Sequence, residues 1–237
     1  MDEDAPRRSG SDAERVRTTY AAYDQAGRDH LWDRNNPGFD RLKSDTERTL
    51  VHRLRASLVA GRPTKALDAG CGRGDLQVLA DSAALDIVWD GIDLLPDRIA
   101  DATARVPGAA YLVASADAMP FGDNTFDLVS TITLFSSIPS AAMEAAVAAE
   151  IARVLRPDGW LVWYDLRYGN PSNPAVHGVS RRRLAELFPG WAAELRSITV
   201  APPVARRLGR LTPVAYPLLH AIPPVRSHLI GRLRCPA

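Results

Sequence analysis

The chain has 237 residues, 46% hydrophobic and 24% charged, which suits one well-buried α/β domain with modest additions. Its net charge of +1 offers no general attraction for nucleic acid or acidic membranes, so neither is expected as a partner. Only Cys71 and Cys235 are present, too few for a disulfide framework or a cysteine zinc cluster. The N-terminus lacks the apolar core of a signal peptide, and no later stretch approaches a membrane span. These features predict a cytoplasmic protein.

The N-terminal part of the sequence predicts a helical cap. Residues 1–11 are polar and are expected to form a disordered lead-in. Apolar residues at helical spacing predict helices over 12–25 and 44–60. The segment 28–39 between them is polar, aromatic and turn-rich, as a lid over a ligand would be. We therefore assign residues 12–62 to a helical cap or lid.

A glycine turn follows the first predicted strand. The mostly apolar residues 65–69 predict a buried strand, and 75–81 carry apolar side chains at helical spacing. Gly70, Gly72 and Gly74 lie between them, where glycine permits positive φ and lets backbone N–H groups approach a ligand. The free N–H groups at the start of the next helix face the same space. Glycine turns also join strands to helices for purely structural reasons, so the triad alone leaves both interpretations open.

The next predicted strand, 86–93, supports a ligand. It ends in Asp93, 25 positions after Asp68, which suits one βαβ unit whose second carboxylate accepts hydrogen bonds from ribose hydroxyls. We therefore predict Asp93 as the ribose ligand, with Leu94 beside it. The alternative is that Asp93 is a helix N-cap before Pro96.

With these residues the sequence resembles the class I S-adenosylmethionine-dependent methyltransferases. The family's acid-x-Gly-x-Gly-x-Gly motif is matched in full from Asp68 to Gly74, and its second acid is Asp93. Residues 125–129 resemble the family's fourth strand, and 153–161 resemble its turn into the fifth strand, with Asp158 in place of the usual first glycine. The resemblance covers about residues 45 to 166.

The resemblance also implies which residues hold the cofactor. Asp117 is expected beside the adenine, and the backbone N–H of Ala118 is expected to contact the same ring. The expected cofactor-binding set is Asp68, Gly70, Cys71, Gly72, Gly74, Asp93, Leu94, Asp117, Ala118 and Thr133.

The fold implied by the family is a doubly wound, seven-stranded, mostly parallel sheet, which we assign to residues 63–237. The remaining strands are expected over 109–115, 126–132, 160–166, 195–201 and 227–233, the last two forming an antiparallel closing pair. Further helices are predicted over 141–155 and 179–188.

The implied activity is transfer of the methyl group of S-adenosylmethionine to a hydroxyl or amine of a small molecule, with S-adenosylhomocysteine as product and no metal. A sugar or a secondary metabolite is a candidate acceptor. The segment 133–138 lacks the Asn/Asp-Pro-Pro-Tyr/Phe run of DNA adenine methylases, which argues against methylation of nucleic-acid amino groups. The alternatives are an RNA or protein methyltransferase, a nucleotide-binding oxidoreductase, and a non-catalytic cofactor-binding protein.

The acceptor is expected at the carboxyl ends of the fourth and fifth strands and under the lid. Asp165 and His30 are the candidate general bases. The predicted acceptor-binding residues are Tyr23, Trp32, Tyr168, Asn170 and Asn173. The alternatives are that the aromatic residues pack a helix on the sheet and that the asparagines form turns. The other four histidines, His177 among them, are interpreted as surface or structural residues.

The C-terminal tail, 202–237, is rich in arginine. Its charge is interpreted as a solvated surface, with an anionic acceptor group as the alternative. The apolar, proline-punctuated residues 211–224 are expected either to wall the acceptor pocket or to pair with a second subunit in a homodimer.

Overall fold

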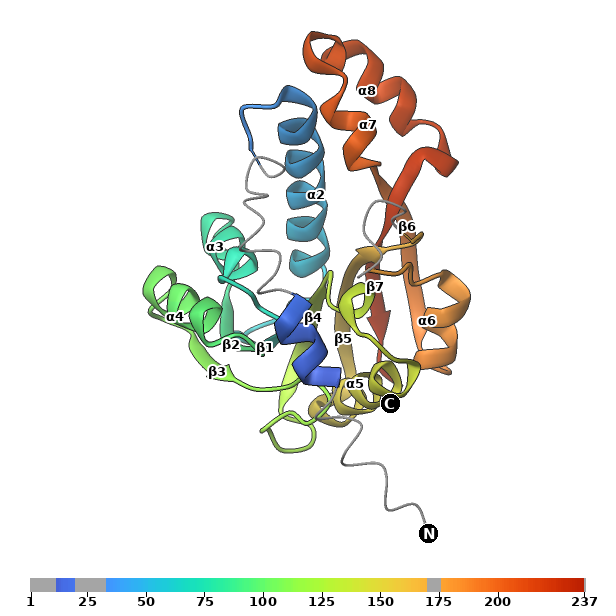
Figure 1. The fold of residues 1–237 in the computed structure, drawn as a ribbon. Coiled ribbons are helices and arrows are strands. Elements are labelled where there is room, and N and C mark those ends of the chain that lie inside the picture. Colours follow the sequence, from blue (N-terminus) through green and yellow to red (C-terminus); the bar gives the residue numbers. More distant parts are fainter. Residues whose placement is uncertain (1–11, 20–32, 170–175, 237) are drawn as a thin grey trace.

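The computed structural model describes residues 12–19, 33–169 and 176–236, which form a seven-stranded sheet flanked by helices (Figure 1). The strand order is β3-β2-β1-β4-β5-β7-β6. The strands are β1 (Thr64–Ala69), β2 (Ile87–Asp93), β3 (Ala110–Val113), β4 (Phe126–Ile132), β5 (Leu155–Leu166), β6 (Ala192–Val200) and β7 (Arg226–Arg234). Strands β1 to β5 pair in parallel, whereas β7 runs antiparallel to both β5 and β6. The predicted doubly wound, mostly parallel fold is confirmed.

Helices cover both faces of this sheet. They are α2 (Pro37–Arg55), α3 (Asp75–Ser82), α4 (Pro96–Arg105), α5 (Ala141–Val154), α6 (Arg181–Leu187), α7 (Pro202–Arg206) and α8 (Thr212–His220). Side chains of α2 and α3 share one apolar cluster with the sheet, and those of α5 and α6 share another. Residues 12–19 are also helical, as predicted, while the rest of that predicted helix lies outside the described residues.

The second predicted helix begins and ends earlier than its apolar repeat suggested. The prediction was 44–60, but α2 starts at Pro37 because Asn36 caps it by accepting a hydrogen bond from the Phe39 backbone N–H. Pro37 occupies a helical position where its missing N–H costs nothing. The end of the predicted lid loop is therefore the first turn of α2.

The turn before the core of β5 depends on two residues. Asp158 has φ of 62°, a left-handed conformation that aspartate tolerates better than most residues and that explains how it replaces a glycine. Gly159 cannot carry a side chain, because a Cβ there would lie 2.8 Å from the Arg156 carbonyl oxygen. Strand β5 starts at Leu155 instead of the predicted residue 160, since residues on both sides of this turn pair with β4.

The tail between β6 and β7 was not predicted to be helical, yet residues 202–225 form α7, α8 and three-residue helical turns. This insertion packs on α2 through a small apolar cluster that includes Phe39, Ala205 and Tyr216. Because β6 runs in the same direction as β5, the insertion that follows β6 begins at the carboxyl ends of the parallel strands (Figure 1). None of the helices in the described part of the chain is both long and apolar enough to cross a membrane.

Candidate active site

The glycine turn lies between β1 and α3, in the middle of the sheet. The neighbours of β1 are β2 and β4, so the turn lies where the strand order reverses, the usual ligand position in open α/β sheets. Gly70, Gly72 and Gly74 have φ values of 75°, 54° and 76°, all in the left-handed region. Such a turn needs glycine because a Cβ in this conformation is strained.

Hydrogen bonds fasten the turn to the end of β2. The backbone N–H groups of Gly70 and Cys71 both donate to the Ile92 carbonyl oxygen, at 2.8 and 2.9 Å. One carboxylate oxygen of Asp93 accepts from the Gly72 N–H at 3.0 Å, and the other accepts from the Leu95 N–H at 3.0 Å. Leu95, not Asp93, occupies the N-cap position of α4. Asp93 therefore lies directly at the turn, where a ribose ligand is expected.

The backbone of the turn is open to a ligand. A Cβ built on Gly72 would have no atom within 4 Å, so this backbone borders open space. Helix α3 begins after Gly74 without a side-chain cap, which leaves the positive end of its dipole facing the same region. Open backbone, an adjacent carboxylate and an uncapped helix end are what adenosine and methionine groups require.

Asp68 lies at the end of β1 beneath the turn, where its carboxylate is hydrogen-bonded to α3 and β4. Its carboxylate is 2% exposed and accepts hydrogen bonds from Gln77 Nε2 at 3.0 Å and Ser130 Oγ at 2.6 Å. Burial raises the pKa of Asp68 to about 6, although these hydrogen bonds lower it. Asp68 thus joins β1, α3 and β4 immediately below the predicted cofactor site.

The other predicted cofactor residues lie around this turn or at neighbouring strand ends. The Asp117 carboxylate accepts a hydrogen bond from the Ser115 hydroxyl, and the Ala118 N–H donates to the Ser115 carbonyl oxygen at 3.2 Å. Cys71 is buried and Leu94 is partly exposed. Thr133, at the end of β4, has φ of 55° and donates its N–H to the Tyr164 carbonyl oxygen.

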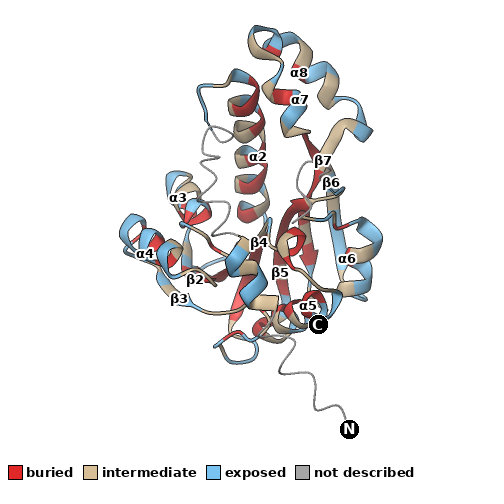
Figure 2. Ribbon diagram, viewed as in Figure 1, coloured by how far each residue is buried: buried red, intermediate tan, exposed pale blue. Residues whose placement is uncertain are grey.

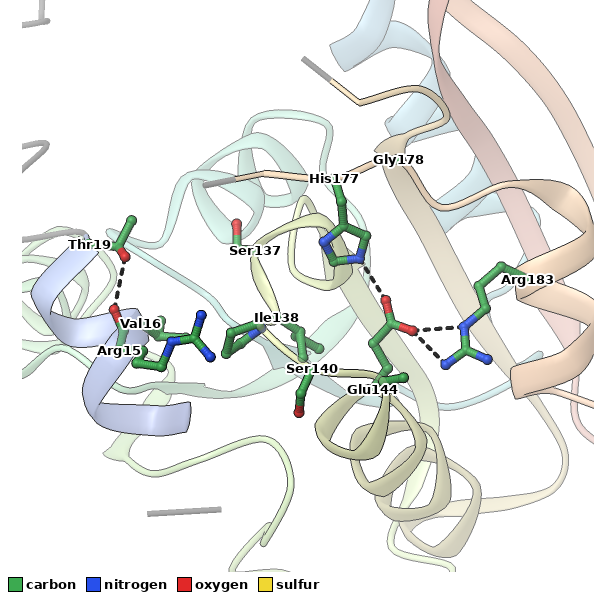
Figure 3. Close-up of a pocket in the computed structure, with 12 residues that line it drawn as sticks. Arg15, Val16, Thr19, Ser137, Ile138, Ser140, Glu144, His177, Gly178 and Arg183 are labelled. Carbon is green, nitrogen blue, oxygen red and sulfur yellow. Dashed lines mark hydrogen bonds and ion pairs between the residues drawn. The ribbon is translucent and has the colours of Figure 1, made fainter. Parts of the chain in front are cut away.

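The segment after β4 passes the glycine turn and then lines a cavity. A Cβ on Gly70 would lie 3.0 Å from the Leu134 side chain, so this segment passes beside the turn. Four residues later Ile138 lines a cavity of about 580 Å³ (Figure 3). The other lining residues come from the helical segment 12–19, the segment between β4 and α5, α5 itself, the loop before α6, and α6. They are Arg15, Val16, Thr19, Ser137, Pro139, Ser140, Ala141, Glu144, His177, Gly178 and Arg183.

Three charged or titratable side chains meet on one wall of this cavity (Figure 3). His177 Nε2 lies 2.7 Å from Glu144 Oε1, and Arg183 donates from Nε to Glu144 Oε2 at 2.8 Å. Burial opposes ionisation of Glu144, but the hydrogen bonds from His177 and Arg183 outweigh it and lower its pKa. The hydrogen bond to Glu144 raises the pKa of His177.

This triad was missed in the sequence, where His177 was interpreted as a surface or structural residue. The three residues come from α5, the loop after β5 and α6, so no local pattern links them. The available signal was weak: Ser180 is the N-cap of α6, which places Arg183 in the first turn of that helix.

Asp165, one of the two predicted bases, has a different position from the one expected. Its side chain is completely buried and accepts hydrogen bonds from the backbone N–H groups of Ser136 and Leu166. Burial raises its pKa to about 6 against these hydrogen bonds. A carboxylate with no exposed surface cannot take a proton from an acceptor, so its placement suits a role in holding the segment after β4.

Most of the predicted acceptor residues lie outside the described residues, namely Tyr23, Trp32, Asn170 and Asn173, together with the second candidate base, His30. Tyr168 is described: it is 46% exposed, with the Arg167 guanidinium 4.3 Å from its ring centre. A Cβ on Gly178, which lines the cavity, would meet the Tyr168 backbone at 2.4 Å. Tyr168 is therefore next to the cavity wall. No three potential metal-binding side chains gather within residues 12–19, 33–169 and 176–236.

The sheet, the glycine turn and Asp93 together define a class I methyltransferase fold. Residues 67–163 match the family model described as "Methyltransferase domain". This match supports a methyltransferase domain over residues 67–163, and solved structures of S-adenosylmethionine-dependent methyltransferases share the class I, Rossmann-like fold.

Curated relatives agree over part of their length. An uncharacterized methyltransferase of Synechocystis is 32% identical over 123 residues, 52% of this chain and 56% of the relative. The 2-methyl-6-phytyl-1,4-hydroquinone methyltransferase of Synechocystis is 33% identical over 54% of this chain and 40% of its own length. The phthiotriol/phenolphthiotriol dimycocerosates methyltransferase of Mycobacterium leprae is 28% identical over 61% and 56%. The chain thus spans about half the length of these relatives.

Solved structures share the fold at low sequence identity. A geranyl diphosphate methyltransferase with bound sinefungin has a TM-score of 0.63 and 18% identity, covering 83% of this chain and 80% of that one. A putative sarcosine dimethylglycine methyltransferase from Galdieria sulphuraria has a TM-score of 0.63 and 17% identity, over 81% and 86%.

Proposed function

We propose that this protein transfers the methyl group of S-adenosylmethionine to a hydroxyl, or alternatively an amine, of a small-molecule acceptor bound in the cavity of Figure 3. The observation that carries the proposal is that the segment after β4 passes beside the glycine turn and then lines this cavity. Leu134 lies beside Gly70 and Ile138 lines the cavity, so one short segment borders both spaces. Methyl transfer needs this arrangement because donor and acceptor must align for in-line displacement.

Different residues around the turn would bind different parts of the cofactor. Asp93 would accept hydrogen bonds from the ribose hydroxyls, and the turn around Asp117 and Ala118 would border the adenine. The backbone at Gly72 and the first turn of α3 would lie along the methionine end. When bound, S-adenosylmethionine supplies an electrophilic methyl group on a sulfonium.

On the acceptor side, His177 replaces Asp165 as the candidate base. If the Nε2–H of a neutral His177 ring donates to Glu144, its Nδ1 atom is left as a proton acceptor. The Glu144 carboxylate orients the ring and stabilises its positive charge after it takes a proton. Arg183 keeps Glu144 ionised in its buried position. His30 remains a second hypothesis.

A small acceptor is supported by the size of the site and by the relatives. A volume of about 580 Å³ is within the range for metabolite-sized ligands. One relative is named for a hydroquinone that carries a phytyl chain, and a structural neighbour for geranyl diphosphate. These names support an organic acceptor with a reactive oxygen or carbon centre, which extends the sugar or secondary metabolite expected from the sequence.

The proposal is tested with S-adenosylmethionine labelled in the methyl group. Hydroquinones and other hydroxyl- or amine-bearing small molecules, total RNA and total protein are offered as separate acceptors. We expect label in small molecules only, and about 100-fold slower transfer by His177→Ala if His177 is the base. His52→Ala, on the exposed side of α2, is the matched control and should match the wild type. Label only in RNA or protein would contradict the proposal.

A further inference from the structure

The outer surface of the insertion between β6 and β7 is unusually apolar. Every exposed residue from 202 to 224 is either an apolar residue or an arginine. Leu211, Val214 and Leu218 are 69%, 70% and 66% exposed, and Ile222 is 47% exposed. Figure 2 shows much of α8 as exposed, in contrast to the buried strands below it. We call Leu211, Val214, Leu218 and Ile222 the outer stripe.

The outer stripe is a continuous face and not a scatter of single residues. Val214 and Leu218 are four positions apart on one side of α8, and Leu211 and Ile222 lie just before and just after this helix. The opposite side of the same helix buries Thr212 and Tyr216 against the rest of the protein. The helix therefore directs large aliphatic side chains outward, the reverse of an ordinary surface helix.

Positive charge accompanies this apolar face. Arg207 and Arg210 are exposed at its N-terminal end, and within the described residues neither has a hydrogen bond or an ion pair to an acid. The sequence from residue 195 to residue 237 contains no aspartate or glutamate. The net charge of +1 is thus distributed unevenly, and the expectation of no acidic partner does not apply to this surface.

We infer that the outer stripe docks the protein on an anionic lipid bilayer, with Leu211, Val214 and Leu218 entering the headgroup region and Arg207 and Arg210 meeting lipid phosphates. Exposed aliphatic side chains beside unpaired arginines are the features of helices that lie in a membrane interface. A second copy of the chain fits less well, because a symmetric contact would bring arginines together with no acid to balance them.

The position of the insertion gives this docking a consequence for the site. The insertion lies at the carboxyl ends of the parallel strands, and the glycine turn lies at the same end of the sheet. In the docked protein, this end of the sheet therefore faces the bilayer, from which a lipid-soluble acceptor would enter the site. This link to the acceptor rests on the proposed function, whereas docking itself does not.

The test is sedimentation of the full chain, without cofactor, with vesicles of phosphatidylcholine alone or with 30% phosphatidylglycerol. We expect binding to the anionic vesicles that falls as salt rises. The variant Leu211→Ser/Leu218→Ser should bind at least about tenfold more weakly, since two aliphatic side chains no longer enter the interface. The variant Arg207→Gln/Arg210→Gln should also lose about tenfold on anionic vesicles.

Matched control variants distinguish docking through the outer stripe from nonspecific adsorption of exposed apolar side chains. Val88→Ser/Val113→Ser removes two apolar side chains that are 53% and 49% exposed elsewhere, and it should bind like the wild type. S-adenosylhomocysteine binding by Leu211→Ser/Leu218→Ser should also be unchanged, which keeps failure of docking distinct from failure of the proposed function. Absence of vesicle binding would overturn the inference, as would a wild-type dimer that Leu211→Ser/Leu218→Ser converts to monomers.

Discussion

His177 Nε2 and Glu144 Oε1 lie 2.7 Å apart on the wall of the cavity, although the two residues are 33 positions apart in the sequence. Glu144 is 4% exposed, so the interaction takes place away from bulk solvent on the carboxylate side. His177 itself is 46% exposed on its side chain and faces the cavity. One ring nitrogen is thus held in place while the imidazole borders the space proposed for the acceptor.

Replacement of Glu144 should change the titration of His177. Because the Glu144 carboxylate raises the pKa of His177, Glu144→Gln should lower it. A raised histidine pKa stabilises the fold below the unfolded pKa of about 6.5, and this contribution is lost as pH rises through the folded pKa. The measurement is an NMR titration of the histidine Cε1–H signals, with His177→Gln identifying the resonance.

His228 provides the internal control for that titration. It is 6% exposed, and burial lowers its pKa to about 3, so its signal should not move between pH 5 and pH 9. An unchanged pKa of His177 in Glu144→Gln would show that the pair does not form in solution.

A methyl group at Gly72 should weaken cofactor binding specifically. Gly72 and Gly61 both have positive φ, 54° and 79°, and a Cβ at either would have no atom within 4 Å. Gly72→Ala and Gly61→Ala should therefore each cost about 1 kcal/mol of stability through backbone strain. Only Gly72→Ala should lower S-adenosylhomocysteine affinity, by about tenfold, in calorimetry. Equal affinities of Gly72→Ala and Gly61→Ala for S-adenosylhomocysteine would show that Gly72 is not part of the cofactor site.

Asp127 should contribute to stability at neutral pH. Its carboxylate is 6% exposed and accepts hydrogen bonds from both terminal nitrogens of Arg62 at 2.7 Å and from the Lys65 N–H at 2.9 Å. Burial opposes ionisation, but these bonds and one from Arg156 hold the pKa of Asp127 well below its usual range. Asp127→Asn should cost about 2 kcal/mol in urea denaturation at pH 7.

The pH dependence follows from the sign of that shift. A lowered carboxyl pKa stabilises the fold above the unfolded pKa of about 3.9 and is lost as pH falls toward the folded value. The difference between the wild type and Asp127→Asn should therefore shrink below pH 4. Asp123→Asn is the control, because Asp123 pairs with Arg153 while 71% exposed and should change stability by less than about 0.5 kcal/mol.

Removal of the Asp93 carboxylate should weaken cofactor binding by about 1–3 kcal/mol, because two charge-assisted hydrogen bonds to ribose are lost. Calorimetry with S-adenosylhomocysteine measures this in Asp93→Ala. Asp90→Ala, on the same strand, is the matched control and should bind like the wild type. An unchanged affinity of Asp93→Ala for S-adenosylhomocysteine would show that Asp93 does not bind the ribose.

The sequence predicted the fold around the glycine turn well because its signals are local. The strand, the three glycines and α3 are consecutive, and Asp93 ends the next strand, so one βαβ unit holds the whole arrangement. The fourth strand and the turn at Asp158 were also predicted, because residues 125–129 and 153–161 resemble family motifs.

The cavity wall proposed for the acceptor could not be predicted from local patterns. The triad of Glu144, His177 and Arg183 is assembled from three separate elements. Asp165 looked suitable as a base, but only the structure shows that the segment after β4 covers it completely. The helical insertion was also missed, because its prolines and outward apolar residues do not give the usual amphipathic pattern.

The central claim is that the glycine turn binds S-adenosylmethionine, and calorimetric titration of the wild-type chain with S-adenosylhomocysteine tests it most directly. The account predicts saturable one-to-one binding of this nucleoside, with no heat of binding for NAD under the same conditions. Binding of NAD together with no binding of S-adenosylhomocysteine would contradict it.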